Sequence, residues 1–220
     1  RITKQVHQGR KAIFITGAAQ GIGLAIARLF AEKGWLVGLY DINENLCKDH
    51  LRDPLLQRAV AGFCDVTDSD SVAAALAAFT DASGGKLDVL VNNAGTTKFV
   101  AHGDLDGLDE ADFQNIYGVN VIGAFQMVRA ARSALTASGR AAVVNVASIA
   151  GVKGVGSSIA YAASKGALIT MTKSLARVLG PEIRVNAVCP GFIEGEWLAE
   201  GMGQAVYDQT RAYLRQKTPL

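Results

Sequence analysis

The chain has 220 residues, 50% of them hydrophobic, which is enough for one sizeable core but not for two. Its 22 basic residues against 20 acidic ones give a formal charge of +2, and they form no tract, so neither a nucleic acid nor an anionic membrane is an expected partner. No stretch approaches the ~20 apolar residues of a membrane helix.

Short apolar runs alternate with longer amphipathic stretches. The first half predicts, in order, a strand at 12–16, a helix at 21–34, a strand at 35–40, a helix at 43–52, a strand at 59–66, a helix at 71–82 and a strand at 87–92. The second half predicts a helix at 109–137, a strand at 141–147, a helix at 158–179 and a strand at 183–188. This alternation predicts a doubly wound parallel sheet with helices on both faces, a single Rossmann-like α/β domain of three layers over residues 1–220. Ligands bind such sheets at the carboxyl ends of the strands.

Beyond Phe192 the alternation gives way to glycine-rich, polar sequence, with Gly195, Gly201 and Gly203, before a helix predicted at 204–217. Two interpretations fit this composition equally well. The segment is either a mobile flap over a binding site or an ordinary surface loop followed by a helix.

A glycine-rich loop joins the first predicted strand to the first predicted helix. It reads TGAAQGIG from Thr16 to Gly23, with glycines at Gly17, Gly21 and Gly23. Glycines let backbone amides approach a pyrophosphate, and a helix N-terminus favours an anion. The spacing predicts a dinucleotide-binding loop that includes Gln20 and Ile22, although a tight turn that binds nothing has the same glycine requirement.

An acidic residue, Asp41, ends the second predicted strand, where a carboxylate accepts hydrogen bonds from an adenosine ribose. The same carboxylate repels a 2′-phosphate. Gln20 within the loop is neutral, so it supplies no base for that phosphate. These residues predict NAD as the cofactor, with NADP less favoured. A plain cap for the next helix is the alternative role of Asp41.

Four polar residues in the second half form a pattern that is hard to explain by packing. Tyr161 and Lys165 are four apart on one helix and share a face, and Ser148 closes the strand before them. Asn120 interrupts an apolar helix, and NNAG at 92–95 closes the fourth strand. Together with the glycine loop, the Asp65-Val66 pair and the Pro190-Gly191 step, these residues resemble the short-chain dehydrogenase/reductase family from Ile13 to Gly191.

The resemblance implies a role for each of the four residues. Tyr161 would exchange a proton with the substrate oxygen, and Lys165 together with the oxidised nicotinamide would lower the pKa of its phenol. Ser148 would hold the substrate oxygen, and Lys165 would also bind the nicotinamide ribose. Asn120 would position a water in a proton relay. The remaining cofactor contacts implied by the resemblance are Asp65, Val66, Asn92, Ala94, Gly95, Pro190, Gly191 and Ile193.

Each of these residues has a purely structural alternative. Ser148 would be a strand-end hydroxyl that is satisfied by backbone. Asn120 would be a buried amide bonded to a neighbouring loop, and Tyr161 with Lys165 would be a solvated helix face.

Two departures from the family pattern stand out. Gly195 occupies a position where the family often has a threonine that contacts the cofactor. The chain also ends at Leu220, whereas the family usually continues with a helix and a seventh strand. The C-terminal strand is therefore expected to be missing from this sequence, most simply because the sequence is an incomplete record.

The predicted function is hydride transfer between NAD(H) and a secondary alcohol or ketone. An NADPH-dependent 3-oxoacyl carrier-protein reductase and a non-catalytic dinucleotide sensor or scaffold are the alternatives. Substrate specificity is expected in 96–103, in 151–157 and after Phe192, where Val152, Val155 and Phe192 suggest a partly apolar pocket. The resemblance also implies a homotetramer or homodimer.

The cysteines and the N-terminus indicate where the protein resides. Cys47, Cys64 and Cys189 are far apart and form no cluster with histidine, so no metal site is expected. This sparse, odd count is typical of reduced thiols, and residues 1–10 lack the apolar run of a secretory signal. A cytoplasmic location is expected.

Overall fold

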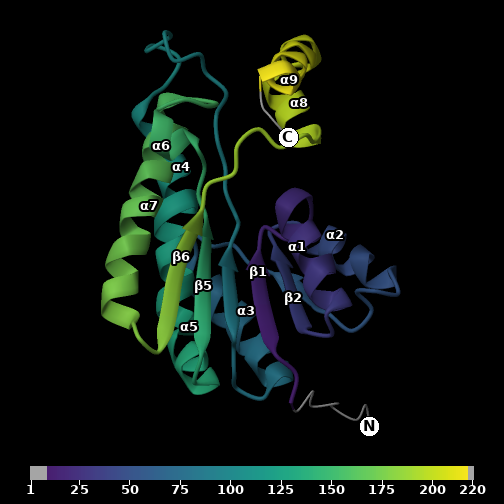
Figure 1. Cartoon of the computed structure of the whole chain (residues 1–220). Helices are drawn as coiled ribbons and strands as arrows, with labels where there is room; N and C mark the ends of the chain where they lie inside the picture. Colours follow the sequence, from purple (N-terminus) through teal and green to yellow (C-terminus); the bar gives the residue numbers. More distant parts are fainter. Residues whose placement is uncertain (1–8, 218–220) are drawn as a thin grey trace.

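Six parallel strands run through the centre of the computed structural model, which describes residues 9–217. They are β1 (Ala12–Thr16), β2 (Leu36–Asp41), β3 (Val60–Phe63), β4 (Val89–Asn92), β5 (Ala141–Val146) and β6 (Ile183–Val188). Their order in the sheet is β3-β2-β1-β4-β5-β6, so the chain starts in the middle and winds outward in both directions (Figure 1). This is the Rossmann-like single domain that the alternation predicts.

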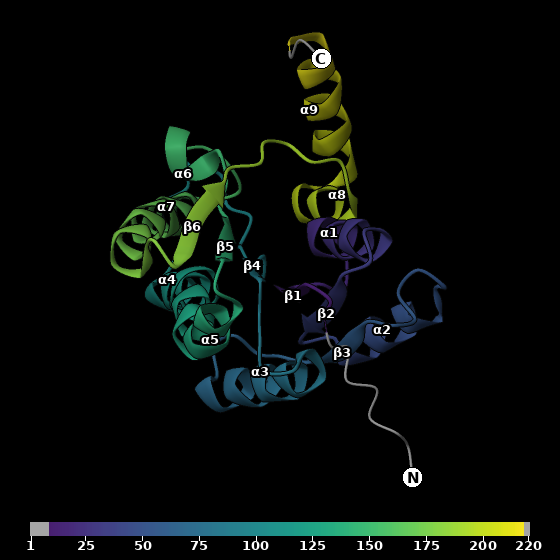
Figure 2. The same ribbon diagram turned by 60° about the horizontal axis from the view of Figure 1, so that its bottom comes forward.

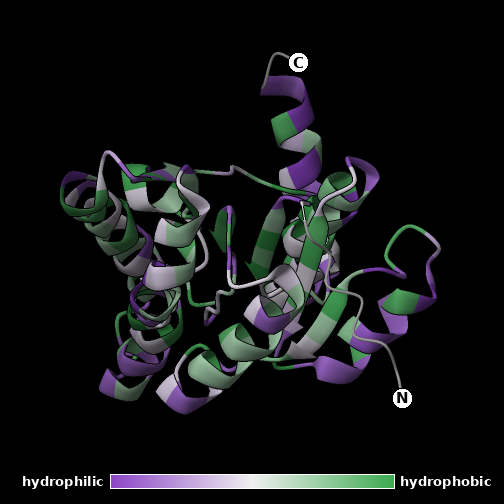
Figure 3. Ribbon diagram, turned by 90° about the horizontal axis from the view of Figure 1, so that it is seen from below, coloured by the Kyte–Doolittle hydropathy of each residue, from purple (hydrophilic) through white to green (hydrophobic). Residues whose placement is uncertain are grey.

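Helices cover both faces of the sheet. One core cluster joins Phe14, Tyr40 and Leu90 to α3 (Ser69–Ser83), α5 (Ala124–Ser138) and α7 (Ile159–Leu179). On the other face, Ile13, Ile15 and neighbouring strand residues pack on α1 (Gly21–Glu32) and α2 (Glu44–Asp49). Seen from below, the hydrophobic strands lie between helices with more hydrophilic outer surfaces (Figure 3). The continuous apolar runs of the strands follow from this two-sided burial.

Most predicted elements are confirmed with small shifts at their ends. The predicted strand at 59–66 is shorter, because pairing with β2 covers only Val60 to Phe63. The predicted helix at 43–52 is α2 followed by a 3-10 turn, η1 (His50–Arg52).

The prediction of one continuous helix over 109–137 is wrong. The structure has α4 (Glu110–Tyr117), then a π-helical turn, η2 (Gly118–Gly123), and then α5. A capping box at Asp109 and Asp112 starts α4. Apolar spacing of three and four cannot distinguish a π-helical turn from an α-helical one, so the periodicity concealed the break. Asn120 lies inside this turn.

Two short helices were not predicted. One is α6 (Ala150–Lys153), directly after β5, and the other is α8 (Glu196–Met202), in the segment with many glycines. The helix predicted at 204–217 is confirmed as α9 (Gln204–Lys217). From β6 the chain crosses toward the α1 side of the sheet before it enters α8 (Figure 1, Figure 2). The polar segment 1–8 and the last three residues lie outside the described part.

Within residues 9–217, none of the helices combines the length and the apolar character that crossing a membrane requires.

Candidate active site

The glycine loop leaves the N-terminus of α1 open. Gly17 and Gly21 have left-handed backbones, with φ of 63° and 55°, which favour glycine. Gln20 precedes α1 without capping it through its side chain, and a Cβ on Gly21 would meet nothing within 4 Å. Amide groups at this helix N-terminus are therefore accessible to an anion. This cradle fits a dinucleotide pyrophosphate.

Close packing explains the other glycines. A Cβ on Gly17 would lie 2.8 Å from the Cα of Ala94, and one on Gly23 would lie 2.6 Å from the Nδ2 of Asn93 and collide with the Gly17 carbonyl. The loop therefore rests directly on the turn after β4. Ile22 is half-buried in the first turn of α1.

Asn93 is a site residue that the sequence analysis missed. Its Nδ2 donates to the carbonyls of Thr16 and Gly17, at 3.1 and 2.8 Å. The backbone amides of Asn93 and Ala94 both donate to the Thr16 hydroxyl. Asn93 therefore fixes the glycine loop against β4. The doubled asparagine of NNAG was the available signal.

Asp41 ends β2 beside the same loop. One carboxylate oxygen accepts from the Ala19 amide at 3.1 Å, and the other accepts from the Asn43 amide at 2.9 Å. The cap of α2 is Asn43, which accepts from the Leu46 amide, so capping is not the role of Asp41. Asp41 ties the glycine loop to the end of β2, and its half-buried carboxylate keeps lone pairs for a further donor.

Asp65 and Val66 follow β3 at the same edge of the sheet. The carboxylate of Asp65 accepts from the amide and the hydroxyl of Thr67. Val66 is buried, and its side chain packs where a Cβ on Gly123 would otherwise be.

Asn92 lies beneath this edge, in the floor of the site. Its Nδ2 donates to the Oδ1 of Asn145 at 2.9 Å, and the Nδ2 of Asn145 donates to the Thr172 hydroxyl at 2.9 Å. All three side chains are buried, and the Oδ1 of Asn92 has no partner in the described part of the chain. This polar chain connects β4, β5 and α7. Asn92 therefore lies buried beneath the site, where it bonds to Asn145, and is not exposed at the surface of the site.

Tyr161 lies in the first turn of α7. The hydroxyl of Ser158 caps the helix by accepting from the Tyr161 amide at 3.2 Å, which fixes the residue at which the helix begins. Burial raises the pKa of the Tyr161 phenol, and a hydrogen bond with the Ser148 side chain partly opposes the rise. The Ser148 hydroxyl also accepts from the Ala150 amide at 3.1 Å. Ser148 and Tyr161 are therefore neighbours, one from the end of β5 and one from α7.

Lys165 is buried one helical turn further on. Its ammonium donates to the carbonyl of Val146 at 2.8 Å and lies 5.6 Å from the centroid of the Tyr161 ring. Burial lowers the Lys165 pKa to about 8, while nearby Cys189 acts in the opposite direction. That Lys165 and the oxidised nicotinamide together lower the Tyr161 pKa stays a prediction; among the groups of the chain itself, burial dominates and raises the pKa of the phenol. The two side chains share a face, and both lie at the carboxyl ends of the strands.

Asn120 bonds to a neighbouring loop. Its Oδ1 accepts from the Thr96 amide at 2.8 Å, and its Nδ2 donates to the Thr96 carbonyl and to the Ser164 hydroxyl, both at 3.0 Å. A Cβ on Gly95 would lie 3.4 Å from both the Asn120 Oδ1 and the Lys165 Nζ. Because Gly95 has no side chain, the side chains of Asn120 and Lys165 can both lie close to its backbone. The loop contact is the structural alternative considered for Asn120.

The segment after β6 borders the same site. The carbonyl of Pro190 accepts from the Ile149 amide at 3.0 Å, which holds Pro190 beside the residue after Ser148. Gly191 and Ile193 are exposed beyond it. The amide of Gly195 donates to the Tyr207 hydroxyl at 3.2 Å.

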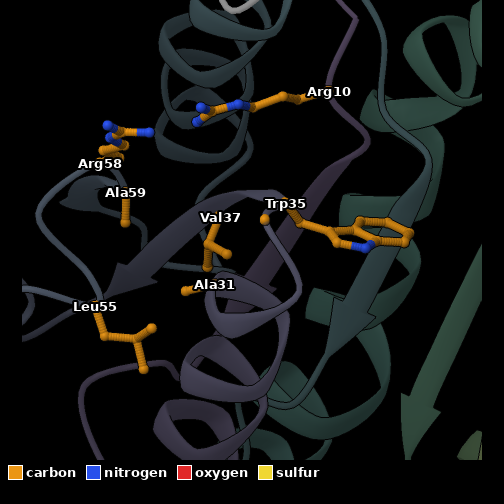
Figure 4. A pocket seen from close by; sticks show the side chains of 8 residues that line it. Arg10, Ala31, Trp35, Val37, Leu55, Arg58 and Ala59 are labelled. Atoms are coloured by element: carbon orange, nitrogen blue, oxygen red, sulfur yellow. The ribbon is translucent and has the colours of Figure 1, made fainter.

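A small cavity of about 90 Å³ lies at the opposite end of the sheet. Its lining comes from the end of α1, from the starts of β1 and β2 and from the residues before β3, and it includes the side chains of Arg10, Trp35 and Arg58 (Figure 4). In a parallel sheet with helices on both faces, ligands bind at the carboxyl ends of the strands. This cavity lies at the amino ends and is therefore separate from the candidate active site.

The comparisons with known proteins agree with this geometry. The short chain dehydrogenase family model matches residues 11–203. The chain is 36% identical over 212 residues to 2-(R)-hydroxypropyl-CoM dehydrogenase of Xanthobacter autotrophicus, covering 94% of this chain and 84% of that protein. It is 39% identical over 193 residues to the 3-oxoacyl-acyl-carrier-protein reductase FabG of Thermotoga maritima, covering 84% and 74%.

A solved structure of NAD+-bound xylitol dehydrogenase is similar with a TM-score of 0.78 and 34% identity, covering 86% of this chain and 73% of that one. The matched family model spans the glycine loop, the polar pattern and the segment after β6. This chain belongs to the short-chain dehydrogenase/reductase family of oxidoreductases, which bind a nicotinamide dinucleotide.

Proposed function

We propose that the chain transfers a hydride between NAD(H) and a secondary alcohol or ketone, with Tyr161 as the proton-transferring group. The observation that carries this proposal is that the Tyr161 phenol bonds with the Ser148 side chain while the Lys165 ammonium lies 5.6 Å from the centre of the same ring. All three side chains lie at the edge of the sheet where the glycine loop opens.

In alcohol oxidation, the carbinol O–H proton passes to the phenolate of Tyr161, and a hydride leaves the carbinol carbon. When bound, the oxidised nicotinamide supplies the hydride acceptor and a positive charge beside the phenol. The Ser148 hydroxyl donates to the substrate oxygen and orients it toward Tyr161. In ketone reduction the same proton moves from the phenol to the substrate oxygen.

Lys165 compensates for the burial of the phenol. Because burial raises the Tyr161 pKa, a phenolate near neutral pH requires nearby positive charge. The ammonium of Lys165 is held in place by the Val146 carbonyl and provides that charge from one helical turn away.

Asn120 acts as a positioning residue. Both protons of its amide and one lone pair of its carbonyl oxygen are engaged by Thr96 and Ser164. One lone pair of the Asn120 oxygen is left to hold a relay water between Lys165 and solvent.

The proposed cofactor is NAD. The carboxylate of Asp41 lies beside the glycine loop, where it accepts from a ribose hydroxyl and repels a 2′-phosphate. The NAD+-bound relative supports the same choice.

A substrate panel tests the proposal. The protein is mixed with NAD or NADP and a series of secondary alcohols, and formation of the reduced cofactor is followed by absorbance. We expect turnover with NAD and at least one alcohol. NAD binding without turnover of any alcohol, or of any ketone in reverse, would instead support a dinucleotide sensor.

A second candidate is reduction of a 3-oxoacyl thioester. The identity to the Thermotoga maritima reductase favours it. It predicts faster oxidation of NADPH with an acetoacetyl thioester than with any simple ketone. The carboxylate of Asp41 speaks against NADPH.

A further inference from the structure

We propose that an aromatic contact between Phe99 and Trp197, here called the aromatic bridge, closes the substrate side of the site and limits the length of the substrate. This inference rests on the proposed function. It assigns a secondary alcohol or ketone with short apolar substituents as the preferred substrate class.

The first half of the aromatic bridge is tied to the start of α7. The hydroxyl groups of Thr97 and Ser157 are 2.7 Å apart, and the Val100 amide donates to the Ser157 carbonyl at 2.8 Å. Phe99 lies between these two anchored residues. The adjacent Gly156 borders the Tyr161 ring, since a Cβ there would lie 3.7 Å from its Cδ1. The backbone around Phe99 is therefore held against the segment that borders the reacting phenol.

The other ring of the aromatic bridge, Trp197, comes from a segment that follows a different strand. Trp197 is in α8, which follows β6, whereas Phe99 follows β4. Because β5 lies beside β6 in the sheet and α8 lies toward α1, the segment that leads from β6 to Trp197 passes the carboxyl end of β5, where the Ile149 amide donates to the Pro190 carbonyl. Ser148 lies there. The crossing of the chain from β6 to α8 is visible in Figure 1.

Contacts with α9 hold the residues that directly precede α8. The ring centroids of Phe192 and Tyr207 are 5.5 Å apart, and Glu194 pairs with Arg211 and Arg215 at 3.2 and 3.0 Å. The segment that carries Trp197 is therefore held between β6 and α9.

The aromatic bridge leaves no room for an alkyl chain. The ring centroids of Phe99 and Trp197 are 5.7 Å apart at an interplanar angle of 61°, which is direct edge contact. A Cβ on Gly201 would overlap the Phe99 ring, so glycine at this position allows α8 to approach. A substrate that extends past the rings must separate them. A short substrate does not reach the rings and leaves their contact intact.

The test compares chain lengths. We measure kcat/KM for 2-butanol and 2-octanol with NAD in the parent and in Trp197→Ala, Phe99→Ala and Gly201→Ala. The parent should prefer 2-butanol. Each variant should raise the ratio of kcat/KM for 2-octanol to that for 2-butanol by about tenfold or more. Tyr213→Ala, which removes an exposed aromatic ring from α9, is the control and should keep the parent ratio.

An unchanged ratio in all three variants would overturn the inference. If the parent turns over no alcohol, the proposed function fails, and the inference is then decided by binding. Trp35→Phe leaves Trp197 as the only tryptophan, so its fluorescence reports alcohol binding to the NAD-loaded protein. Phe99→Ala in that background should tighten 2-octanol binding relative to 2-butanol, and an unchanged relative affinity counts against the aromatic bridge.

Discussion

The Nδ2 of Asn120 donates to the hydroxyl of Ser164 at 3.0 Å, and that hydroxyl donates to the carbonyl of Tyr161 at 2.7 Å. The π-helical turn η2 is thereby connected to the first turn of α7.

Asn120→Ala leaves the polar groups of Thr96 unpaired and should cost about 1–3 kcal/mol of unfolding free energy. We expect kcat to fall more than KM rises, because the cofactor loop is untouched.

Ser164→Ala is the matched control, since it keeps both bonds between Asn120 and Thr96. It should lose less stability and less kcat than Asn120→Ala. Urea unfolding and steady-state kinetics measure the two effects. Equal losses in both variants would show that the Thr96 contact is unimportant.

Tyr161→Phe should reduce turnover by about 10²–10⁴-fold, because only the proton-carrying oxygen is removed. Cofactor affinity should stay near that of the parent, since the ring and the cap at Ser158 remain. Turnover by absorbance and NADH binding by fluorescence give the two readouts. A variant as active as the parent would remove Tyr161 from the mechanism.

Asp41→Ala should narrow the preference for NAD over NADP by about tenfold or more, because the charge that repels a 2′-phosphate is lost. The Ala19 amide also loses its acceptor, so NAD affinity should fall as well. Asp41→Asn keeps the shape and one acceptor oxygen without the charge and separates the two effects. The charge argument fails if the parent already uses NADP as well as NAD.

Burial of Lys165 should make stability rise with pH. Its pKa falls from 10.5 to about 8 on folding. Between these values the unfolded chain holds a proton that the folded chain has lost, so the free energy of unfolding increases with pH, by on the order of 3 kcal/mol in total. Lys165→Met should lack this increase. Urea unfolding of both proteins across that pH window provides the measurement, and parallel curves would contradict the effect.

One thiol should react in the native protein. Burial raises the pKa of Cys47 and of Cys64 to about 12, and the nearby carboxylates of Asp41 and Asp65 add to the rise. Cys189 is exposed. A chromogenic disulfide reagent should therefore titrate a single thiol rapidly, and Cys189→Ser should abolish that phase. Rapid reaction of a second thiol would show that the core opens.

The sheet could be predicted from the sequence because its strands are buried on both faces and their apolar runs are continuous. The breaks in regular structure could not. A π-helical turn keeps the hydrophobic spacing of an α-helix nearly intact, and a helix as short as α6 has no periodicity to detect. The glycines around α8 indicated a loop, although Gly201 serves the approach of Phe99 instead.

The polar residues of the site were identifiable by type and spacing, but their partners were not. Nothing in the sequence distinguishes Asn92, which is buried against Asn145, from Asn93, which bonds to the glycine loop. Nor does the four-residue spacing of Tyr161 and Lys165 reveal how strongly burial opposes the phenolate. Such facts depend on which segments the tertiary fold brings together.

The π-helical turn makes the site sensitive to the number of residues in one helix. A π turn differs from an α turn by a single inserted residue. Deleting Val121 would restore a regular helix and remove the widened turn that holds Asn120. Asn120 would then leave Thr96 and Ser164 even though every polar residue of the site was still encoded. In-frame single-codon deletions within Gly118–Gly123 should therefore be tolerated far less than substitutions at its exposed position, Ile122.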